Sequence, residues 1–237
     1  MRAKTAAPLH AWDLLPKDAI SLQKALAGAV VRSNRFGSGG RRAVRHVAGV
    51  DAAFADGGRI IRAAAVLLDY PGLDVTEKIL IERPTTFPYV PGLLSFREVP
   101  ALLEALWQLP AAPDLILCDG HGYAHPRRFG LACHLGLWLD TPTIGVAKSR
   151  LTGSHEEPGV AKGDVSWLLA DKGLRPGERI GAVLRTRERV RPVYVSAGHR
   201  VSLRAAVALT LGCTTRYRLP EPTRLADKLS KAHRDGG

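Results

Sequence analysis

Residues 46–82 read HVAGVDAAFADGGRIIRAAAVLLDYPGLDVTEKILIE, and their pattern is the strongest fold signal in the chain. Residues 46–54, 59–69 and 74–82 form three strand-like apolar runs. They are separated by DGG and YPG, which are strong turn signals because Gly and Pro supply the backbone angles of tight turns. Three consecutive strands joined by tight turns predict an antiparallel meander.

Beyond a proline-rich interruption, strand-like and helix-like segments alternate, and this alternation predicts parallel strand pairing. The predicted segments are a helix over 96–109 introduced by Ser95, a strand over 115–118, a helix over 129–139, a strand over 143–146, a loop over 152–162, a strand pair over 180–186 and 193–197, a helix capped by Ser202 and ending near 211, and a helical segment after Pro222. A helix over 13–31 and a basic, glycine-rich flexible loop over 33–42 precede the meander. The prediction is an α/β fold with a mixed sheet, in which an antiparallel three-strand meander is continued by parallel strands and flanked by helices.

Composition indicates a globular protein, with 237 residues, 46% hydrophobic and 24% charged. We expect a single domain over residues 1–237, with loose tails at 1–10 and 229–237. The three cysteines form no disulfide-like pattern, which favours a reducing, cytoplasmic location. The longest apolar run, residues 63–68, is far shorter than the roughly 20 residues of a membrane helix. We therefore expect no membrane partner.

The charge is strongly basic, because 34 Lys and Arg against 22 Asp and Glu give a formal net charge of +12. Such an excess attracts polyanions, and nucleic acid is the obvious one. An arginine-rich composition imposed by a GC-rich genome is the alternative.

Asp51 and Asp119 lie at positions where exposure to solvent does not account for a charged side chain. Asp51 lies in the middle of the first strand among apolar residues, where an unpaired buried carboxylate is costly. Asp119 ends a buried strand and precedes GHG, and ligand groups in open α/β sheets collect at the carboxyl ends of strands. An outward-facing strand residue and an Asp-Gly turn are the respective alternatives.

Glu98 has two interpretations. The string SFRE at 95–98 matches a capping box, in which the Glu98 carboxylate would return to the Ser95 amide. Taken with Asp51 and Asp119, however, it adds to an oxygen-rich set that suits Mg²⁺ or Mn²⁺ rather than zinc. Divalent ions on such carboxylates activate water for phosphodiester hydrolysis, so a basic protein with an acidic pocket fits a nuclease.

Several strings, in this order, resemble the endonuclease V family. They are GVD at 49–51, PYVPG at 88–92, FRE at 96–98, DGHGYAHPR at 119–127, IGVAKS at 144–149, GHR at 198–200 and PEPTR at 220–224. The resemblance covers about residues 46–227 and implies an RNase H-like fold. It implies a DNA repair endonuclease that recognises deoxyinosine and hydrolyses the second phosphodiester bond 3′ to the lesion, leaving 3′-hydroxyl and 5′-phosphate ends.

The resemblance also implies roles for single residues. Asp51, Glu98 and Asp119 would bind Mg²⁺, for which Mn²⁺ can substitute, and would activate the water. Lys148 would face a phosphate, and Asp227 would lie near the metal. A solvated loop lysine and an exposed helical aspartate are the alternatives for the last two.

The proline-rich string supplies a candidate wedge, formed by Pro88, Tyr89, Val90 and Pro91. The two prolines stiffen the loop, so that the aromatic ring can fill the gap left when a base leaves the stack. A tyrosine packed on the sheet is the alternative. By resemblance, the extruded hypoxanthine would enter a pocket lined by Gly92, Leu94, Gly120, His125, Gly130 and Leu131.

Other functions remain open at this point. An inosine-specific ribonuclease differs only in reading a 2′-hydroxyl on its substrate. A non-catalytic lesion-binding protein and a transposase- or resolvase-type enzyme are further alternatives, whereas the histidine and cysteine spacing disfavours a zinc site. The expected partner is deoxyinosine-containing DNA, with inosine-containing RNA as the alternative, and the expected state is a monomer.

Overall fold

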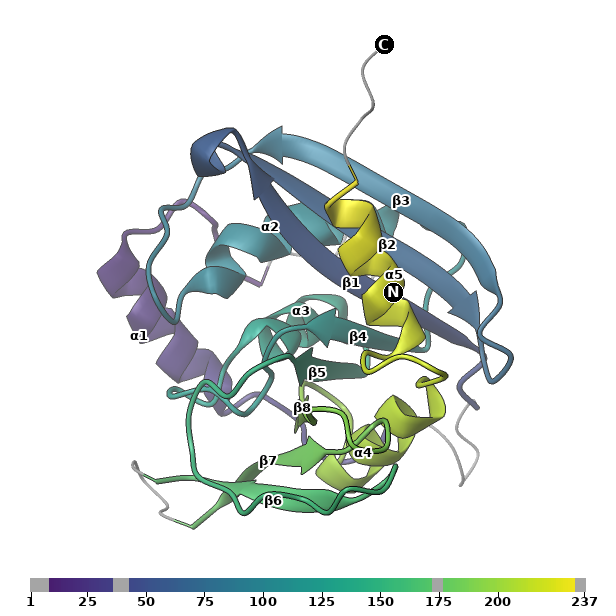
Figure 1. Ribbon diagram of the computed structural model, residues 1–237. Helices are drawn as coiled ribbons and strands as arrows, with labels where there is room; N and C mark the ends of the chain where they lie inside the picture. The colour runs from purple at the N-terminus through teal and green to yellow at the C-terminus, as the bar shows by residue number, and fades with distance from the viewer. Residues whose placement is uncertain (1–8, 36–42, 172–176, 233–237) are drawn as a thin grey trace.

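The computed structural model describes residues 9–35, 43–171 and 177–232 (Figure 1). Its elements are α1 (Pro16–Ala27), β1 (His46–Ala55), the short 3-10 turn η1 (Asp56–Gly58), β2 (Ile60–Asp69), β3 (Val75–Pro84), α2 (Leu94–Trp107), β4 (Leu115–Asp119), α3 (Leu131–Leu139), β5 (Thr143–Ala147), β6 (Val165–Leu169), β7 (Arg179–Leu184), β8 (Val193–Ala197), α4 (Leu203–Gly212) and α5 (Glu221–Ser230).

One eight-stranded sheet runs through the described residues in the order β3-β2-β1-β4-β5-β8-β7-β6. The strands β1, β2 and β3 form the antiparallel meander, and β4 and β5 continue it in parallel from β1. The strands β8, β7 and β6 extend the sheet with antiparallel pairs. The predicted mixed sheet is confirmed, including the strand pair now seen as β7 and β8.

Helices cover both faces of the meander, with α2 behind it and α5 in front, while α3 lies over β4 and β5 (Figure 1). Successive strand residues point to opposite faces, so in β2 Leu67 packs into the core beneath α2 while Leu68 packs against α5. In β1, Gly49 presses against α5 so closely that a Cβ there would lie 2.0 Å from the main-chain carbon of Pro222. Asp51, two residues further on, therefore faces the α5 side as well.

The capping box predicted at the start of the second helix is wrong. The helix α2 begins at Leu94 with Leu93 as its N-cap, and no side chain caps it. Ser95 lies inside the first turn, where its hydroxyl is 3.0 Å from Nδ1 of the buried His134. The carboxylate of Glu98 is therefore not committed to a helix cap.

Two other elements differ from the prediction. The helix α1 is shorter than the predicted 13–31, because it begins at Pro16, which tolerates the first helical turn, and ends at Ala27 before Gly28. The strand β6 was not predicted, and only Leu168 among its residues is buried, as expected for an edge strand with a weak apolar signal.

The predicted tail boundaries also need correction. His10 packs against Trp12 and Trp138, and Leu229 and Ser230 belong to α5. Residues 36–42 of the predicted basic loop lie outside the described residues. None of the helices in the described part of the chain is long and apolar enough to cross a membrane.

Candidate active site

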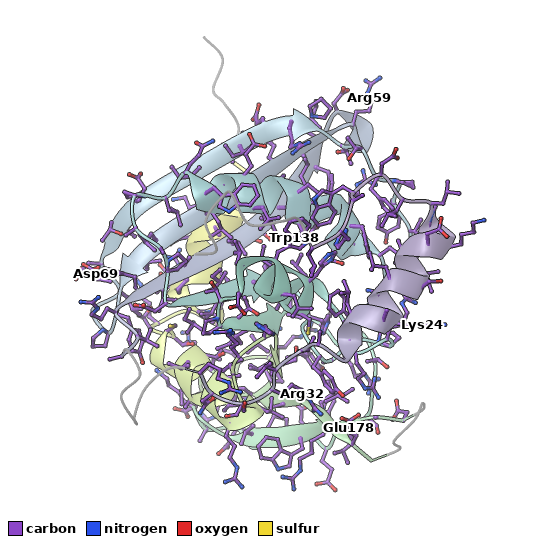
Figure 2. All side chains as sticks on the ribbon, turned by 180° about the vertical axis from the view of Figure 1, so that it is seen from behind. Lys24, Arg32, Arg59, Asp69, Trp138 and Glu178 are labelled. Carbon is purple, nitrogen blue, oxygen red and sulfur yellow. The ribbon has the colours of Figure 1, made fainter. Side chains whose placement is uncertain are left out.

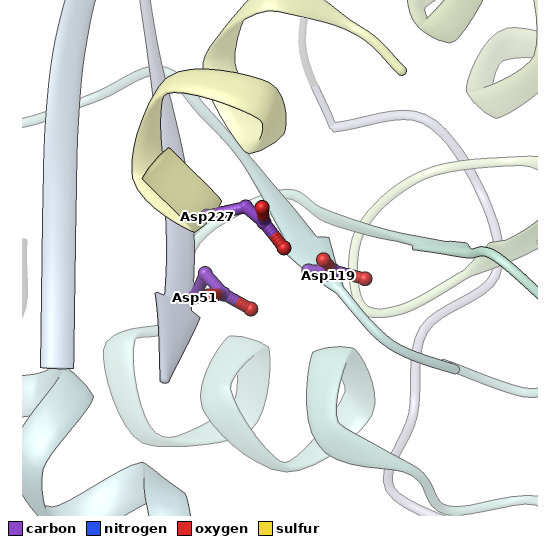
Figure 3. Close-up of side chains that lie close together, drawn as sticks. All are labelled: Asp51, Asp119 and Asp227. Atoms are coloured by element: carbon purple, nitrogen blue, oxygen red, sulfur yellow. The ribbon is translucent and has the colours of Figure 1, made fainter. Parts of the chain in front are cut away.

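Three aspartates meet where β1, β4 and α5 come together (Figure 3). Val50 of β1 is paired in parallel with Cys118 of β4, so Asp51 and Asp119 are the next residues on neighbouring strands. The helix α5 brings Asp227 to the same place. One carboxylate oxygen from each aspartate lies within 4.8 Å of the others. The two aspartates singled out by the sequence, and the one implied by resemblance, therefore form a single cluster.

Negative charge is concentrated in this cluster, and its effect is clearest at Asp51. Its side chain is buried, and burial is the main reason that its pKa rises to about 6, with repulsion from Asp119 and Asp227 adding to the rise. The Ser230 hydroxyl, 2.5 Å from Oδ2 of Asp51, and the Lys148 ammonium act in the opposite direction. A buried carboxylate among like charges is the electrostatic state that a bound cation relieves.

Glu98 reaches the same region from α2. It is buried, and burial followed by repulsion from Asp51 and Asp119 raises its pKa well above the ordinary value, while Arg97 opposes the rise. Glu98 does not share the close oxygen cluster of the three aspartates, yet it lies near enough for two of them to act on it. It is therefore a fourth carboxylate at the edge of the site.

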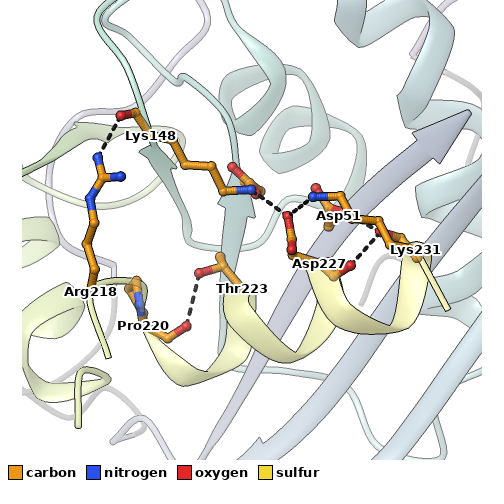
Figure 4. Close-up of polar contacts among 9 residues, drawn as sticks. Asp51, Lys148, Arg218, Pro220, Thr223, Asp227 and Lys231 are labelled. Atoms are coloured by element: carbon orange, nitrogen blue, oxygen red, sulfur yellow. Dashed lines mark hydrogen bonds and ion pairs between the residues drawn. The ribbon is translucent and has the colours of Figure 1, made fainter. Parts of the chain in front are cut away.

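Two lysines contact the carboxylates (Figure 4). The Nζ atom of Lys148 lies 2.5 Å from Oδ2 of Asp119 and 2.5 Å from Oδ1 of Asp227, and Nζ of Lys231 lies 2.6 Å from the same Asp227 oxygen. Burial opposes ionisation of Asp227, but the two ammonium groups hold its pKa below the ordinary value. Neither a free surface lysine at 148 nor a free helical aspartate at 227 describes this arrangement.

The residues present fit a divalent cation. Every donor in the cluster is a carboxylate oxygen, the ligand type that Mg²⁺ and Mn²⁺ prefer. Repulsion from neighbouring carboxylates adds to burial in raising the pKa values of Asp51 and Glu98, and a bound cation would offset that repulsion. The cluster can hold a metal ion, and the donor set argues for a hard one.

A pocket of about 290 Å³ begins one residue after Asp119. All six residues predicted to surround a base line it: Gly92, Leu94, Gly120, His125, Gly130 and Leu131. Three of the four predicted wedge residues, Tyr89, Val90 and Pro91, line it too, whereas Pro88 is exposed and outside its lining. The structure therefore brings together two sets of residues that the sequence analysis treated separately.

Tyr89 stands at the exposed edge of this pocket. Its side chain is 70% exposed, so the alternative of a tyrosine packed on the sheet is wrong. Phe87, two residues earlier, is buried with Leu93 and Phe96 and anchors the loop instead. The loop thus holds an aromatic ring in solvent, while its neighbour Phe87 is anchored in the core.

The sequence analysis missed several residues of the site. The pocket is also lined by Gln23, Ser95, His121, Ser149, Arg150 and Leu151. Gln23 interrupts the apolar face of α1, which was an available signal, but Ser230 lay in a predicted tail and gave none. Burial lowers the pKa of His121 to about 4, and burial followed by Arg127 lowers that of His125 to about 3, so both pocket histidines are neutral.

A larger cavity of about 630 Å³ lies beneath the end of α1, near Lys24, Arg32 and Glu178 (Figure 2). Arg32 stacks on the Tyr123 ring at 3.9 Å and pairs with Glu178 at 3.4 Å, and Arg128 pairs with the same carboxylate. None of the acids of the aspartate cluster lines this cavity. Its charged groups are largely engaged with one another, so it is not part of the candidate active site.

A carboxylate cluster on a mixed α/β sheet, beside a pocket of base size in a basic chain, defines a nuclease. The family model for endonuclease V matches residues 24–228, and the chain belongs to the endonuclease V family. The protein is 52% identical over 221 residues to endonuclease V of Trichormus variabilis, covering 93% of this chain and 96% of the relative. It is 54% identical over 223 residues to that of Azotobacter vinelandii, covering 94% and 96%. The family resemblance noted in the sequence is confirmed.

Solved structures agree with this assignment. Endonuclease V from Streptomyces avermitilis superposes with a TM-score of 0.84 at 46% identity, covering 93% of each chain. Endonuclease V from Ciona intestinalis, in complex with a 24mer DNA containing an inosine followed by a ribo-adenosine, superposes with a TM-score of 0.77 at 28% identity. That match covers 91% of this chain and 95% of the Ciona chain.

Proposed function

We propose that this protein is a Mg²⁺-dependent deoxyinosine endonuclease that hydrolyses the second phosphodiester bond 3′ to the lesion and leaves 3′-hydroxyl and 5′-phosphate ends. One observation carries the proposal: Asp119 belongs to the carboxylate cluster and the adjoining Gly120 lines the base-sized pocket. A strand whose inosine enters the pocket therefore passes close to the carboxylates. The inosine-containing DNA bound by the Ciona relative supports this choice of substrate.

Asp51, Glu98 and Asp119 would hold the metal, with Asp227 beside it. Bound Mg²⁺, or Mn²⁺ in its place, would supply the Lewis acid that lowers the pKa of a water and offsets the charge of the phosphodiester. Lys148, whose ammonium lies at Asp119 and Asp227, would face a phosphate oxygen of the substrate. Ser230 keeps the Asp51 carboxylate oriented through its hydroxyl.

The pocket would select hypoxanthine by shape. Guanine carries an amino group that hypoxanthine lacks, and rigid walls that leave no room for this group would reject guanine. Glycines at 92, 120 and 130 bring main chain rather than side chains to the walls. Tyr89 would fill the gap left in the stack by the extruded base.

A second candidate, cleavage at inosine in RNA, is favoured by one observation: the DNA in the Ciona complex carries a ribonucleotide directly after the inosine. The presence of all the carboxylates in the site argues against a non-catalytic lesion-binding protein. A monomeric, cytoplasmic protein remains our prediction.

The test uses the purified protein with an end-labelled duplex carrying one deoxyinosine, its RNA counterpart, and an undamaged duplex, each with and without Mg²⁺. We expect a metal-dependent nick at the second phosphodiester 3′ of the deoxyinosine, with 3′-hydroxyl and 5′-phosphate ends. Faster cutting of the RNA would favour the second candidate. Binding without cutting in Mg²⁺ would overturn the proposed activity.

A further inference from the structure

A buried glutamine connects α1 to the base pocket. The helix α1 lies outside the sheet, against the loop that leads into α2 (Figure 1). Within it, Ala19 and Gln23 are one helical turn apart and face inward, and Gln23 is only 1% exposed. A polar side chain buried this deeply must satisfy its amide inside the protein.

The Gln23 amide donates hydrogen bonds to main-chain carbonyls on two sides of the pocket. Its Nε2 donates to the carbonyl oxygen of Gly92 at 3.1 Å and to that of Phe129 at 2.6 Å. Its Oε1 accepts a hydrogen bond from Nε of Arg127 at 2.5 Å, and Nη2 of Arg127 donates to the same Gly92 oxygen at 2.7 Å. Both amide hydrogens therefore bind protein carbonyls, which leaves neither of them to donate to a ligand.

These bonds span the pocket. Gly92 ends the wedge loop, and Phe129 precedes Gly130, so the two carbonyls belong to segments that line the pocket from different parts of the chain. Gly92 has φ +80°, and a Cβ there would lie 2.6 Å from Nη2 of Arg127, which shows how tightly this corner is packed. Gln23 joins the two segments through its amide, and Arg127 adds a second link to the Gly92 carbonyl.

We infer that Gln23 is a positioning residue that fixes the width of the base pocket and thereby its preference for hypoxanthine over guanine. The inference rests on the proposed function. The two bases differ by one amino group, so walls that relax by a fraction of an ångström admit the larger base. The chemistry at the carboxylates does not involve Gln23, so its loss acts on base binding.

The variants Gln23→Met and Gln23→Glu both retain the volume of the side chain and remove the two donated hydrogen bonds. Gln23→Glu keeps an acceptor for Nε of Arg127, whereas Gln23→Met removes it and leaves Arg127 only its bond to the Gly92 carbonyl, so the pair separates the two hydrogen bonds that Gln23 donates from its contact with Arg127. Gln108→Met, at the exposed end of α2, is the matched control. Single-turnover and steady-state cleavage of deoxyinosine and deoxyguanosine duplexes would be measured, together with thermal unfolding.

We expect both variants to raise KM for the deoxyinosine duplex by about tenfold, with kcat within about twofold of wild type, and to lower the preference for deoxyinosine over deoxyguanosine. If Gln23 had a purely structural role, the variants would contain a smaller fraction of active protein and show a lower apparent kcat. Their KM and their base preference would be unchanged. That result, or variants that behave like Gln108→Met, would overturn the inference. A wild-type protein that cuts neither duplex would instead overturn the proposed function itself.

Discussion

The aspartate cluster should make the protein less stable than it could be at neutral pH, and Asp51→Asn tests this. The pKa of Asp51 rises from its ordinary 3.8 to about 6 in the folded protein. At about 1.4 kcal/mol for each pH unit, keeping this carboxylate ionised at neutral pH costs on the order of 3 kcal/mol. Asparagine retains the size and can still accept from Ser230, but its amide hydrogens lose about 1 kcal/mol for want of good partners. We expect a net gain of about 2 kcal/mol in the free energy of unfolding.

The gain has a defined pH dependence. Because the folded pKa is raised, the stability that the protonated Asp51 contributes is fully present below pH 3.8 and is lost as the pH rises through about 6. The advantage of the asparagine variant should therefore be small near pH 4, grow between about pH 4 and pH 6, and stay constant above about pH 7. For a chain of this length it corresponds to a rise in Tm of about 4–8 °C.

The assay is denaturant and thermal unfolding in a chelator near pH 4 and near pH 8, with exposed Asp13→Asn as the control for removal of a surface charge. Added Mg²⁺ should reverse the order, because it binds and stabilises the folded wild type more than the variant. An asparagine variant no more stable than wild type near pH 8, or favoured by the same amount at both pH values, would contradict this prediction. The carboxylates would then not be under electrostatic strain.

Three further predictions concern cleavage. Asp51→Ala should abolish nicking in Mg²⁺ while a gel-shift assay still detects binding to the deoxyinosine duplex; retained metal-dependent turnover would remove Asp51 from the ligand set. Tyr89→Ala should leave the free energy of unfolding within about 0.5 kcal/mol, because the ring is 70% exposed, yet lower kcat/KM on a duplex about tenfold and less on a single strand. Equal losses on both substrates would exclude a wedge. Ser230→Ala removes a hydroxyl that donates a hydrogen bond to Asp51, so the Asp51 pKa should rise further. The acidic limb of the pH–rate profile should then move to higher pH. An unmoved limb would show that Asp51 ionisation does not limit the rate.

Local sequence signals predicted the elements that form through interactions between residues close in sequence. The meander followed from strand periodicity and two turn strings, and the Ser202 cap is present because its hydroxyl binds the nearby amide of Ala205. The Ser95 cap failed for a non-local reason, since that hydroxyl contacts His134, 39 residues away in sequence. Only the sheet order shows that Ser95 lies against α3, and no single string contains that order.

The residues of the site fall into the same two groups: those that local sequence signals identify and those that depend on contacts distant in sequence. Asp51 and Asp119 were identifiable as carboxylates in apolar strands, and the pairing of β1 with β4 then makes them neighbours. Asp227 and Ser230 belong to a polar helix whose approach to β1 depends on the contact of Gly49 with α5. Nothing near position 227 indicates that contact, so only the resemblance to endonuclease V placed Asp227 near the metal.

The loop after β4 explains how cutting at a fixed distance from a lesion can arise. Asp119 belongs to the carboxylate cluster and the adjoining Gly120 lines the pocket, so this loop joins the two sites directly. The loop has little freedom, because a Cβ on Gly122 would lie 2.3 Å from the carbonyl oxygen of Ala197, and one on Gly145 would lie 2.5 Å from the amide nitrogen of Gly122. Main chain is thus packed directly on main chain, with no side chain to yield. On the proposed function, a base in the pocket and a phosphate at the carboxylates would therefore lie at a fixed distance from each other, and that distance would select one phosphodiester bond.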